Sequence, residues 1–368
     1  MKRLVVLTLL LLTACEQAPA PMPALRLSEV LGGDNTAGFL RAEQPREFSF
    51  PADHGPHPGF RNEWWYVTGN VETAEGRRFG YQVTFFNVDL NNEDTTSRAS
   101  AWHSSHLWMA HLALTDAESG RHVAVERFSR ANPGLAGATP SPFRVWLENW
   151  QLASVNNDNE SPWRVQAADS EIALDLQLLP LKPPVLQGDA GLSRKSEAAG
   201  NASYYYSMTR LQTTGTVRIG AEEFAVTGNS WLDREWSTSA LAADQKGWDW
   251  FSLQFHDGQE LMYYQLLNSE GNPDTNSHGN WTDAQAVQTP VTRDQLVLQP
   301  LKQWTGPDGV DYPIQWAVQY GDQRWRVEAL VDDQFMSLSL PYWEGAVRVV
   351  DAMTGTEVGR GFLEMVRQ

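Results

Sequence analysis

The chain has 368 residues, of which 42% are hydrophobic, so it can build a sizeable core and global disorder is excluded. Its net charge is -17 and it contains no Lys/Arg cluster that would follow a phosphate backbone, which excludes nucleic acid as a partner. Sixteen Trp residues indicate a β-rich core, a large cavity lined by aromatic rings, or both.

The N-terminus has the features of an export signal. A short basic start precedes the apolar run Leu4–Leu12, which is too short to span a bilayer as a stable anchor. The run ends in Leu-Thr-Ala-Cys, which resembles a bacterial lipoprotein signal whose Cys15 is lipidated; an ordinary secretory signal is the alternative. Glu16 after the cysteine favours routing to the outer membrane, facing the periplasm. Cys15 is the only cysteine, which suits an oxidising compartment without a disulfide framework.

From Phe48 onward the pattern mostly has a period of two, which is typical of strands. Tyr81, Val83 and Phe85, for example, share one face of a predicted strand. Short helices are predicted only at Leu25–Leu31 and Thr238–Asp244. The predicted strands are, in chain order, Phe79–Phe86, Trp108–Leu114, Phe143–Trp150, Trp163–Ala167, Ile172–Leu179, Tyr204–Leu211, Gly215–Ile219, Glu223–Asn229, Trp248–Phe255, Glu260–Asn268, Gln315–Tyr320, Arg324–Leu330, Tyr342–Val350 and Gly359–Val366.

Many short strands separated by turn signals favour an all-β sandwich or barrel. Two segments, NEWWYVTGNVETAEGRRFGYQ and GWDWFSLQFHDGQELMYYQ, share an aromatic strand, a turn and a second aromatic strand. In both, the step from the turn glycine to the tyrosine is the same, from Gly76 to Tyr81 and from Gly258 to Tyr263. This weak echo favours two related β-domains that join near residues 231–243.

The segment HGPHPGFRNEWWY combines a rigid Pro/Gly loop with charged and aromatic residues. Its prolines and glycines could hold His54 and His57 at a strand entrance, but two histidines alone do not make a metal site. Arg61 and Glu63 would share one strand face, where they could pair. We expect a structural polar network here, formed by His54, Arg61, Glu63 and Arg234, and no bound metal.

The segment GNSWLDREWSTSAL places three charges between Trp231 and Trp236. In a strand, Asp233 and Glu235 share a face and Arg234 lies on the other. Buried charges need partners, so the segment is either an ion network between domains or the source of a carboxyl with a raised pKa in an apolar site. A proton donor of this kind is what adding water to an alkene requires.

Two further segments carry polar groups in apolar surroundings. His111 lies in the middle of a predicted apolar strand and is either a hydrogen-bonded core histidine or a ligand contact. Tyr204 and Tyr206 face one way and Tyr205 the other, and such phenols suit a cavity wall. No nucleophile elbow, P-loop, dinucleotide fingerprint, zinc-protease motif or EF-hand loop occurs in the chain, so no cofactor is expected.

An ordered set of motifs resembles the AttH-like family, which is related to the carotenoid 1,2-hydratases (hydroxyneurosporene synthases). The motifs are DHGPHPGFRNEWWYVTGN, FGYQVTFF, MAHLALTD, LQGDAGLSRKSEAAGNASYYYSMTRL, WLDREWSTSAL, GWDWFSLQFHDGQELMYYQL and YWEGAV, and the match runs from about Phe48 to Val366. The resemblance implies an all-β fold of two tandem lipocalin-like (calycin-type) β-barrels. It also implies association with ABC-type permeases of the lipoprotein-release kind.

With this fold, we divide the chain into a signal peptide (1–14), a lipidated Cys15 with a stalk or lead-in (15–47), and two lipocalin-like domains (48–233 and 234–368). The hydratase relatives are thought to use an acidic proton donor in an aromatic cavity. The resemblance does not assign that acid to one position, and the candidates are Asp233, Glu235 and Asp249. The predicted ligand-binding residues are Trp65, Tyr81, His111, Tyr204, Tyr206, Trp231, Trp236 and Trp250.

Two functions follow as hypotheses, with an envelope protein of purely structural role as a third. The first is a lipoprotein in the cell envelope that binds an apolar small molecule or lipid and associates with an ABC-type permease. The second is a hydro-lyase that protonates an isoprenoid-type double bond, with a secreted hydrolase as a weaker variant. The lipoprotein signal is unusual for an enzyme of carotenoid synthesis, which favours another substrate.

Overall fold

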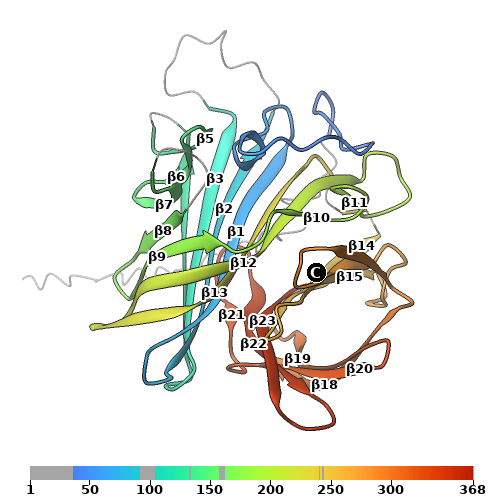
Figure 1. The fold of residues 1–368 in the computed structure, drawn as a ribbon. Coiled ribbons are helices and arrows are strands. Elements are labelled where there is room, and N and C mark those ends of the chain that lie inside the picture. Colours follow the sequence, from blue (N-terminus) through green and yellow to red (C-terminus); the bar gives the residue numbers. More distant parts are fainter. Residues whose placement is uncertain are drawn as a thin grey trace, which may run out of the picture.

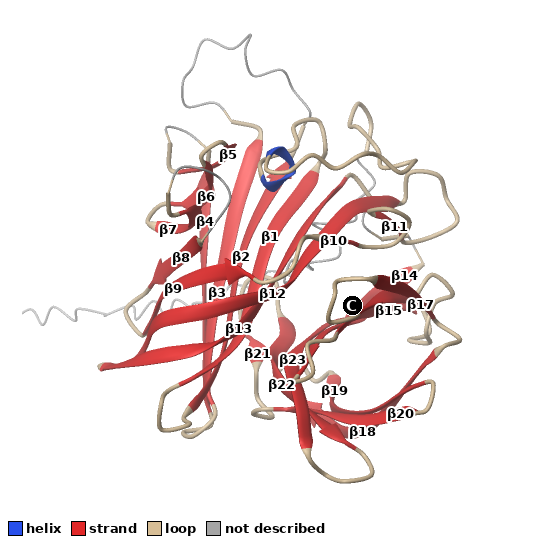
Figure 2. Cartoon of the chain, viewed as in Figure 1, coloured by secondary structure: helices blue, strands red, loops and turns tan. Residues whose placement is uncertain are grey.

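A computed structural model of the chain describes residues 36–91, 104–131, 134–156, 162–239, 241–242 and 244–367. The predicted signal peptide, Cys15 and the helix predicted at Leu25–Leu31 therefore lie outside the described residues. Within the described part, the one helical element is a 3-10 turn, η1 (Ala52–His54), and nearly all the rest is strand or loop (Figure 2). No helix in these ranges has the length and apolar character needed to cross a membrane.

The first barrel is built from antiparallel strands in the order β4-β3-β2-β1-β13-β12-β9-β8-β7-β6-β5, with β10 and β11 paired to β12 (Figure 1). Its strands are β1 (Asn62–Glu72), β2 (Arg78–Asp89), β3 (His106–Asp116), β4 (Arg121–Arg130), β5 (Ala136–Pro140), β6 (Phe143–Leu147), β7 (Trp150–Ser154), β8 (Trp163–Ala168), β9 (Ile172–Pro180), β10 (Val185–Leu186), β11 (Leu192–Arg194), β12 (Ala202–Ile219) and β13 (Glu222–Ser237).

The second barrel has the order β17-β16-β15-β14-β23-β22-β20-β19-β18, with β21 paired to β22. Its strands are β14 (Gln245–Phe255), β15 (Glu260–Asn268), β16 (His278–Thr282), β17 (Gln288–Thr292), β18 (Leu296–Thr305), β19 (Asp311–Tyr320), β20 (Gln323–Ala329), β21 (Phe335–Met336), β22 (Tyr342–Asp351) and β23 (Glu357–Arg367).

Both barrels follow one plan. The first strand of each barrel, β1 or β14, pairs with the second strand on one side and with the last strand on the other. The two segments that echo each other in the sequence form the equivalent hairpins β1–β2 and β14–β15. Pairing of the first and last strands curls each sheet into an up-and-down barrel whose end strands, β4 and β5 or β17 and β18, are not paired with each other, and the prediction of two tandem lipocalin-like β-barrels is confirmed.

The strands that face the other barrel are buried on both sides, because one face packs in the barrel core and the other packs on the neighbouring barrel. In β1, Trp65 and Val67 belong to the core of the first barrel. Trp64 and Tyr66, which point the opposite way, pack in a cluster with Trp250 and Phe362 of the second barrel. The aromatic run Trp-Trp-Tyr is thereby divided between two apolar layers.

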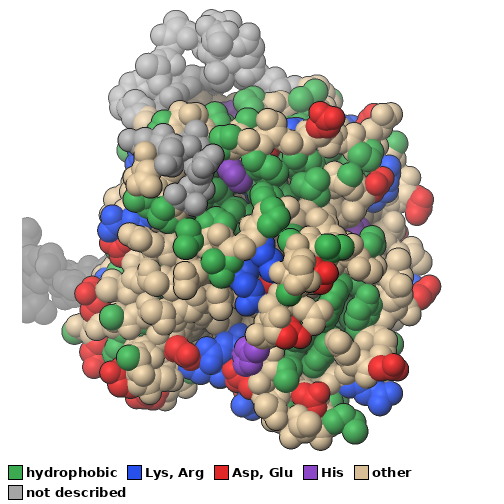
Figure 3. Space-filling view, in the orientation of Figure 1, with side chains coloured by type: hydrophobic (Ala, Val, Ile, Leu, Met, Phe, Trp, Pro, Cys, Tyr) green, Lys and Arg blue, Asp and Glu red, His purple; other side chains and the backbone are tan. Residues whose placement is uncertain are grey.

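Ion pairs line the groove between the two lobes, where Figure 3 shows Lys and Arg side chains gathered on the face toward the viewer. Arg78 pairs with Glu357 at 2.9 Å, and Arg360 pairs with Glu72 at 2.8 Å. Deeper in the join, Glu260 of β15 accepts from both Lys182 and Arg210 of the first barrel at 2.6 Å. These contacts hold the barrels together around the apolar layer.

Residues before β1 cover one end of the first barrel. Phe48 packs against Tyr206 and Trp236 of the barrel core, and the His54 ring packs edge-on against Trp163. Tyr204 donates to the backbone oxygen of Gln44, so part of the segment assigned to a stalk or lead-in also packs on the barrel. In Figure 1 this segment crosses the upper end of the first barrel.

Several predicted elements have different bounds in the structure. The predicted strand Phe143–Trp150 is two strands, because Glu148 adopts a φ of 55° in the turn between β6 and β7. The strands predicted on either side of residues 212–214 are one strand, β12, and the described residues of 238–244 form no helix. The chain passes from one sheet to the other between Ser237 and Gln245, a few residues after the boundary placed at 233/234.

Candidate functional site

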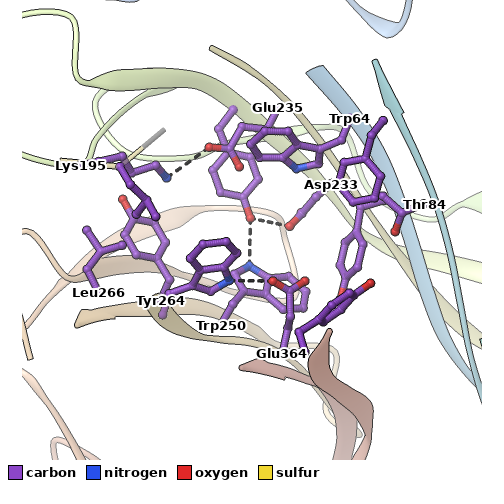
Figure 4. A pocket seen from close by; sticks show the side chains of 15 residues that line it. Trp64, Thr84, Lys195, Asp233, Glu235, Trp250, Tyr264, Leu266 and Glu364 are labelled. Carbon is purple, nitrogen blue, oxygen red and sulfur yellow. Dashed lines mark hydrogen bonds and ion pairs between the residues drawn. The ribbon is translucent and has the colours of Figure 1, made fainter. Parts of the chain in front are cut away.

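A pocket lies between the two barrels, formed by their facing outer surfaces and not by either barrel interior (Figure 4). The volume in which the centre of a water molecule fits is about 90 Å³. One water needs roughly 10–15 Å³ by this measure, so the pocket has room for a small organic molecule. Its lining residues are Trp64, Tyr66, Thr84, Phe86, Lys195, Tyr205, Asp233, Glu235, Leu241, Trp248, Trp250, Tyr264, Leu266, Tyr342 and Glu364.

Asp233 reaches the pocket from the outer face of β13, where its carboxyl is buried among neutral donors. Tyr205 donates to Oδ2 at 2.5 Å, and Ser207 and the Trp231 indole donate to Oδ1 at 2.6 Å. Burial raises the pKa of Asp233 to about 7, although the three hydrogen bonds lower it. Near neutral pH this carboxyl can therefore both hold and release a proton.

A second carboxyl of raised pKa comes from the other barrel. Glu364 lies on the outer face of β23 between Phe362 and Val366, and its Oε1 accepts from the Trp248 indole at 2.6 Å. Burial raises the pKa of Glu364 to about 7, with further contributions from the charges of Asp233 and Glu235. The pocket thus has one protonatable carboxyl on each barrel.

Behind the pocket wall lies a third carboxyl. Glu344 on β22 is buried and accepts from the Tyr66 hydroxyl at 2.5 Å, and it is the strand neighbour of Glu364. Burial raises the pKa of Glu344 well above its usual range, and the nearby charge of Glu364 raises it further. Both effects favour the neutral form of Glu344.

The remaining polar pair of the pocket joins Lys195 to Glu235. The ammonium nitrogen lies 3.2 Å from Glu235 Oε1 and 4.1 Å from the centre of the Tyr264 ring. Ser203 also donates to Glu235. Burial lowers the pKa of Lys195, but the charge of Glu235, together with Tyr264 and the hydrogen bonds to both groups, gives a net upward shift, so the ammonium stays charged.

Indole rings form much of the apolar wall. Trp250 packs edge-on against Tyr66 at 5.2 Å, and its nitrogen donates to the Tyr205 hydroxyl at 3.1 Å. Trp64 and Trp248 are only partly buried. The Asp233 carboxyl is thus connected through Tyr205 to an indole of the opposite barrel, and the pocket offers ring faces that could stabilise a cation.

The predicted ligand-binding residues divide into two groups. Trp250 lines the pocket, Trp231 holds Asp233 from behind, and His111 lies behind Tyr342, whose hydroxyl is 2.9 Å from His111 Nδ1. Burial lowers the pKa of His111 to about 3, so this ring is neutral. The others do not line the pocket but pack inside the first barrel: Trp65, Tyr81, Tyr204, Tyr206 and Trp236.

The reason for this difference is the double burial of the strands. Aromatic residues occur on both faces of β1, β12 and β13, and alternation alone does not tell which face meets the second barrel. In the run Tyr204-Tyr205-Tyr206, the structure turns Tyr205 toward the pocket and the other two toward the barrel core. Tyr204 and Tyr206, which are predicted ligand contacts, therefore lie on the face of β12 that is turned away from this pocket.

The three candidate acids also separate. Asp233 and Glu235 line the pocket from the same face of β13, as the alternation predicts. Asp249 is not among the lining residues, because the outward positions of β14 beside it are occupied by Trp248 and Trp250. Asp249 instead accepts from Arg367 and, at 3.1 Å, from Gln265.

The predicted polar network closes the end of the first barrel. Arg234 is fully buried over the ring of Trp65, and its Nη2 lies 2.6 Å from Glu63 Oε2. His57 stacks on Trp236 at 3.5 Å and reaches Asp53 at 3.0 Å. The pairing of Glu63 with Arg234 is therefore within one barrel and on the side of β13 opposite the pocket.

His54 and Arg61 also lie in this region. The His54 ring nitrogen is 2.6 Å from the Tyr206 hydroxyl, and burial lowers the pKa of His54 to about 3. The backbone nitrogen of Arg61 donates to Thr238. Within the described residues, no group of three His, Cys, Asp or Glu side chains is arranged to hold a metal ion.

Sequence reasoning missed most of the residues that the second barrel contributes. Glu364 is the one charge in the run Gly-Phe-Leu-Glu-Met-Val, a signal of the same kind as His111 in its apolar strand. Glu344 and Tyr342 lie in the motif YWEGAV, which carries the family resemblance but no spacing that points to a site. Lys195 lies in a loop of mixed composition, where nothing in the pattern indicates that it turns inward.

Comparison with known proteins gives one family and a small group of similar folds. The model of the AttH-like family matches residues 41–367. No curated protein matches the sequence. A crystal structure of a Nitrosomonas europaea protein provisionally designated AttH aligns with a TM-score of 0.78 at 32% identity, covering 89% of this chain and 99% of that one.

Two more distant structures share the fold. Kievitone hydratase from Nectria haematococca aligns with a TM-score of 0.69 at 14% identity, over 90% of this chain and 97% of that one. CghA, in a structure with Sch210972, aligns with a TM-score of 0.52 at 13% identity, over 94% and 98% of the two chains. Because the family model covers most of the sequence and a relative at 32% identity has the same two barrels, this chain belongs to the AttH-like family.

Proposed function

We propose that the pocket between the barrels binds an apolar, alkene-bearing molecule and that Asp233 protonates its double bond so that water adds to it. One observation carries this proposal: Asp233 and Glu364, from opposite barrels, line one aromatic pocket and each has a pKa of about 7. A general acid and a general base are most effective when their pKa lies near the working pH.

The roles follow from the surroundings of each group. Asp233 in its neutral form gives its proton to one alkene carbon, which leaves a positive charge on the other. The rings of Trp64, Trp248 and Trp250 stabilise that cation through their faces. Glu364 in its ionised form takes a proton from the water that adds to the cation. The proton gained by Glu364 balances the one lost from Asp233, and exchange with solvent restores both.

Glu235 and Asp249 are less suited to the acid role. Glu235 is already engaged by the Lys195 ammonium, and Asp249 lies outside the pocket. The kinship of fold with a protein named kievitone hydratase supports water addition as the reaction class. Binding of an apolar ligand without turnover is the second candidate, and it is favoured by the mainly apolar lining of the same pocket.

Solvent exchange separates these two candidates without knowledge of the natural substrate. Geraniol incubated with the protein in D2O and then recovered should carry deuterium, detected by mass spectrometry, if its double bond is reversibly protonated. Asp233→Asn should abolish this incorporation while tryptophan fluorescence still reports binding. Asp249→Asn, a buried carboxyl outside the pocket, serves as the matched control and should retain it. Binding without any deuterium in the unaltered protein would leave only the binding function.

We also propose that Cys15 carries a lipid that anchors the protein to the envelope, where a permease partner would deliver or receive its ligand. The support is the sequence before residue 16, which the structure does not describe. Radiolabelled palmitate should be incorporated into the protein, and Cys15→Ser should abolish both the label and its recovery in the membrane fraction. Retained membrane association of that variant would contradict the anchor.

A further inference from the structure

Lys195 is the one cation among the residues that line the pocket, and the proposed reaction does not use it. Its ammonium lies 3.0 Å from Ser193 Oγ and 3.2 Å from Glu235 Oε1, and it faces the ring of Tyr264. In Figure 4 it projects toward Glu235 from the side of the pocket occupied by Tyr264 and Leu266. An ammonium group has three donors, and here two have oxygen partners and the third meets a ring face.

The position of Lys195 is fixed by its backbone. Its N–H donates to the Asn201 oxygen at 2.9 Å, and its carbonyl accepts from the Gln245 side chain at 2.6 Å. Ser193, which also contacts the ammonium, is joined to Tyr264 of the second barrel at 2.9 Å. The donor is therefore presented at the join of the barrels by a rigid shell, as recognition of one ligand atom requires.

The charges around Lys195 select what it can recognise. Glu235 neutralises the ammonium, and Asp233 and Glu364 line the same pocket. An anionic head group would therefore face carboxyl groups that outnumber the single cation. A neutral acceptor, such as a hydroxyl or carbonyl oxygen, can replace the weak ring contact of the third donor without this repulsion.

The distance between Lys195 and the proposed acid, Asp233, is set by strand β13. Asp233 and Glu235 are two residues apart on one face of β13, which separates their Cα atoms by about 7 Å. Lys195 contacts Glu235, so a ligand that meets both Lys195 and Asp233 has its oxygen and its double bond about that far apart. Indole rings of Trp64, Trp248 and Trp250 line the same pocket.

We propose that Lys195 is the specificity-determining residue of this pocket and that the substrate is a neutral, oxygen-bearing alkene. Its hydroxyl or carbonyl oxygen accepts a hydrogen bond from the Lys195 ammonium, which places the double bond beside Asp233. This inference rests on the proposed function for the role of the double bond, but the recognition of the oxygen is a property of binding alone.

Three probes with ten carbons each test the recognition: myrcene as the hydrocarbon, geraniol as the alcohol and geranate as the carboxylate. Their affinities can be measured by quenching of tryptophan fluorescence, since three Trp residues line the pocket. Geraniol should bind about tenfold more tightly than myrcene, the gain typical of a hydrogen bond to a charged group, and more tightly than geranate. Equal affinities for geraniol and myrcene, tighter binding of geranate, or no binding of any probe would overturn the proposal.

Variants assign the preference to Lys195. Lys195→Met leaves Glu235 unpaired and can fail to fold, so the double variant Lys195→Met/Glu235→Gln, which removes both charges, is measured beside it. The folded double variant should bind geraniol about as weakly as myrcene, with myrcene affinity unchanged within about twofold. Lys302→Met, which breaks an exposed ion pair with Asp332 on the second barrel, is the matched control and should keep the preference. A double variant that still prefers geraniol would contradict the assignment.

The two proposals fail in different ways. If geraniol is preferred through Lys195 but no deuterium enters it from D2O, recognition stands and protonation fails. If deuterium enters geraniol and myrcene equally and Lys195 has no effect on affinity, protonation stands and recognition fails.

Discussion

Asp233 is held by three neutral donors and by burial, and this balance has a consequence for stability. The pKa of a free aspartate is near 4, whereas that of Asp233 in the folded chain is about 7. Between these values the unfolded chain has released the proton and the folded chain still binds it. Folding stability therefore falls as pH rises from about 4 to about 7, and the loss is complete above pH 7.

We predict that Asp233→Asn removes this loss. Relative to the unaltered protein, the variant should gain about 2–3 kcal/mol in free energy of unfolding between pH 5 and pH 8, because Asn has no proton to release. Urea denaturation at both pH values measures the change. Asp175→Asn, which alters an exposed carboxyl paired with Arg164, should show the same offset at both pH values. A constant offset for Asp233→Asn would show that its pKa is not raised.

At the scale of single residues, the sequence could identify charged groups in apolar strands but not their neighbours. Asp233 and Glu235 were found because three charges between tryptophans demand partners. Glu364 and Lys195 join the site through pairing of distant strands and a loop that folds inward, so no local spacing links them to Asp233. The position of the second barrel decides which face of β12 lines the pocket and therefore that Tyr205 lies there. The alternation of residues within β12 carries no information about that position.

At the scale of elements, successive side chains of β13 point to opposite faces of the strand. One face carries a structural ion pair and the other carries carboxyls of the pocket. Its inner face carries Arg234, which is paired with Glu63 in the barrel core, and its outer face carries the carboxyls of the pocket. Burial raises the pKa of Glu63, but the charge of Arg234 together with the contacts from His57 and Asn87 lowers the net pKa to about 2. The ion pair thus fixes the register of β1 and β13 beneath the site.

We predict that Glu63→Gln destabilises the protein by about 3 kcal/mol, because it leaves the buried Arg234 without its countercharge. The double variant Glu63→Gln/Arg234→Met should lose less, since neither charge then remains unpaired. Urea denaturation at pH 7 measures both. Asp175→Asn breaks an exposed ion pair of the same barrel and should cost less than about 1 kcal/mol. A cost for Glu63→Gln as small as that of Asp175→Asn would contradict a stabilising role for the buried pair.

The strands that the sequence predicted best have one polar and one apolar face, or an uninterrupted apolar run. Ile172–Leu179 and Glu260–Asn268 agree closely with β9 and β15. The predicted strands Tyr204–Leu211 and Gly215–Ile219 are continuous in β12, where the backbone of β9 passes close to Gly215. The exposed strand β18 was missed, because Leu296–Thr305 has little alternation and contains a proline.

At the scale of the whole molecule, the site exists only because two barrels meet. The family resemblance gave the two barrels, and the echo between their first hairpins gave the repeat. The angle and register of their contact depend on side chains that are far apart in the sequence. Gly80 of β2 and Ala346 of β22 mark one such contact, because a Cβ added at Gly80 would overlap with that of Ala346.

We predict that Gly80→Ala forces the barrels apart and that Ala346→Gly compensates for it. Overpacking at this contact should cost about 1–3 kcal/mol of unfolding free energy in the unaltered background, and less than about 0.5 kcal/mol when residue 346 is glycine. Ala346 shares its face of β22 with Glu344, so Gly80→Ala should also weaken geraniol binding, and Ala346→Gly should restore it. Urea denaturation and fluorescence quenching of the two single variants and the double variant complete the cycle. Additive losses in both measurements would show that the barrels do not press on each other at Gly80 and that the pocket tolerates their displacement.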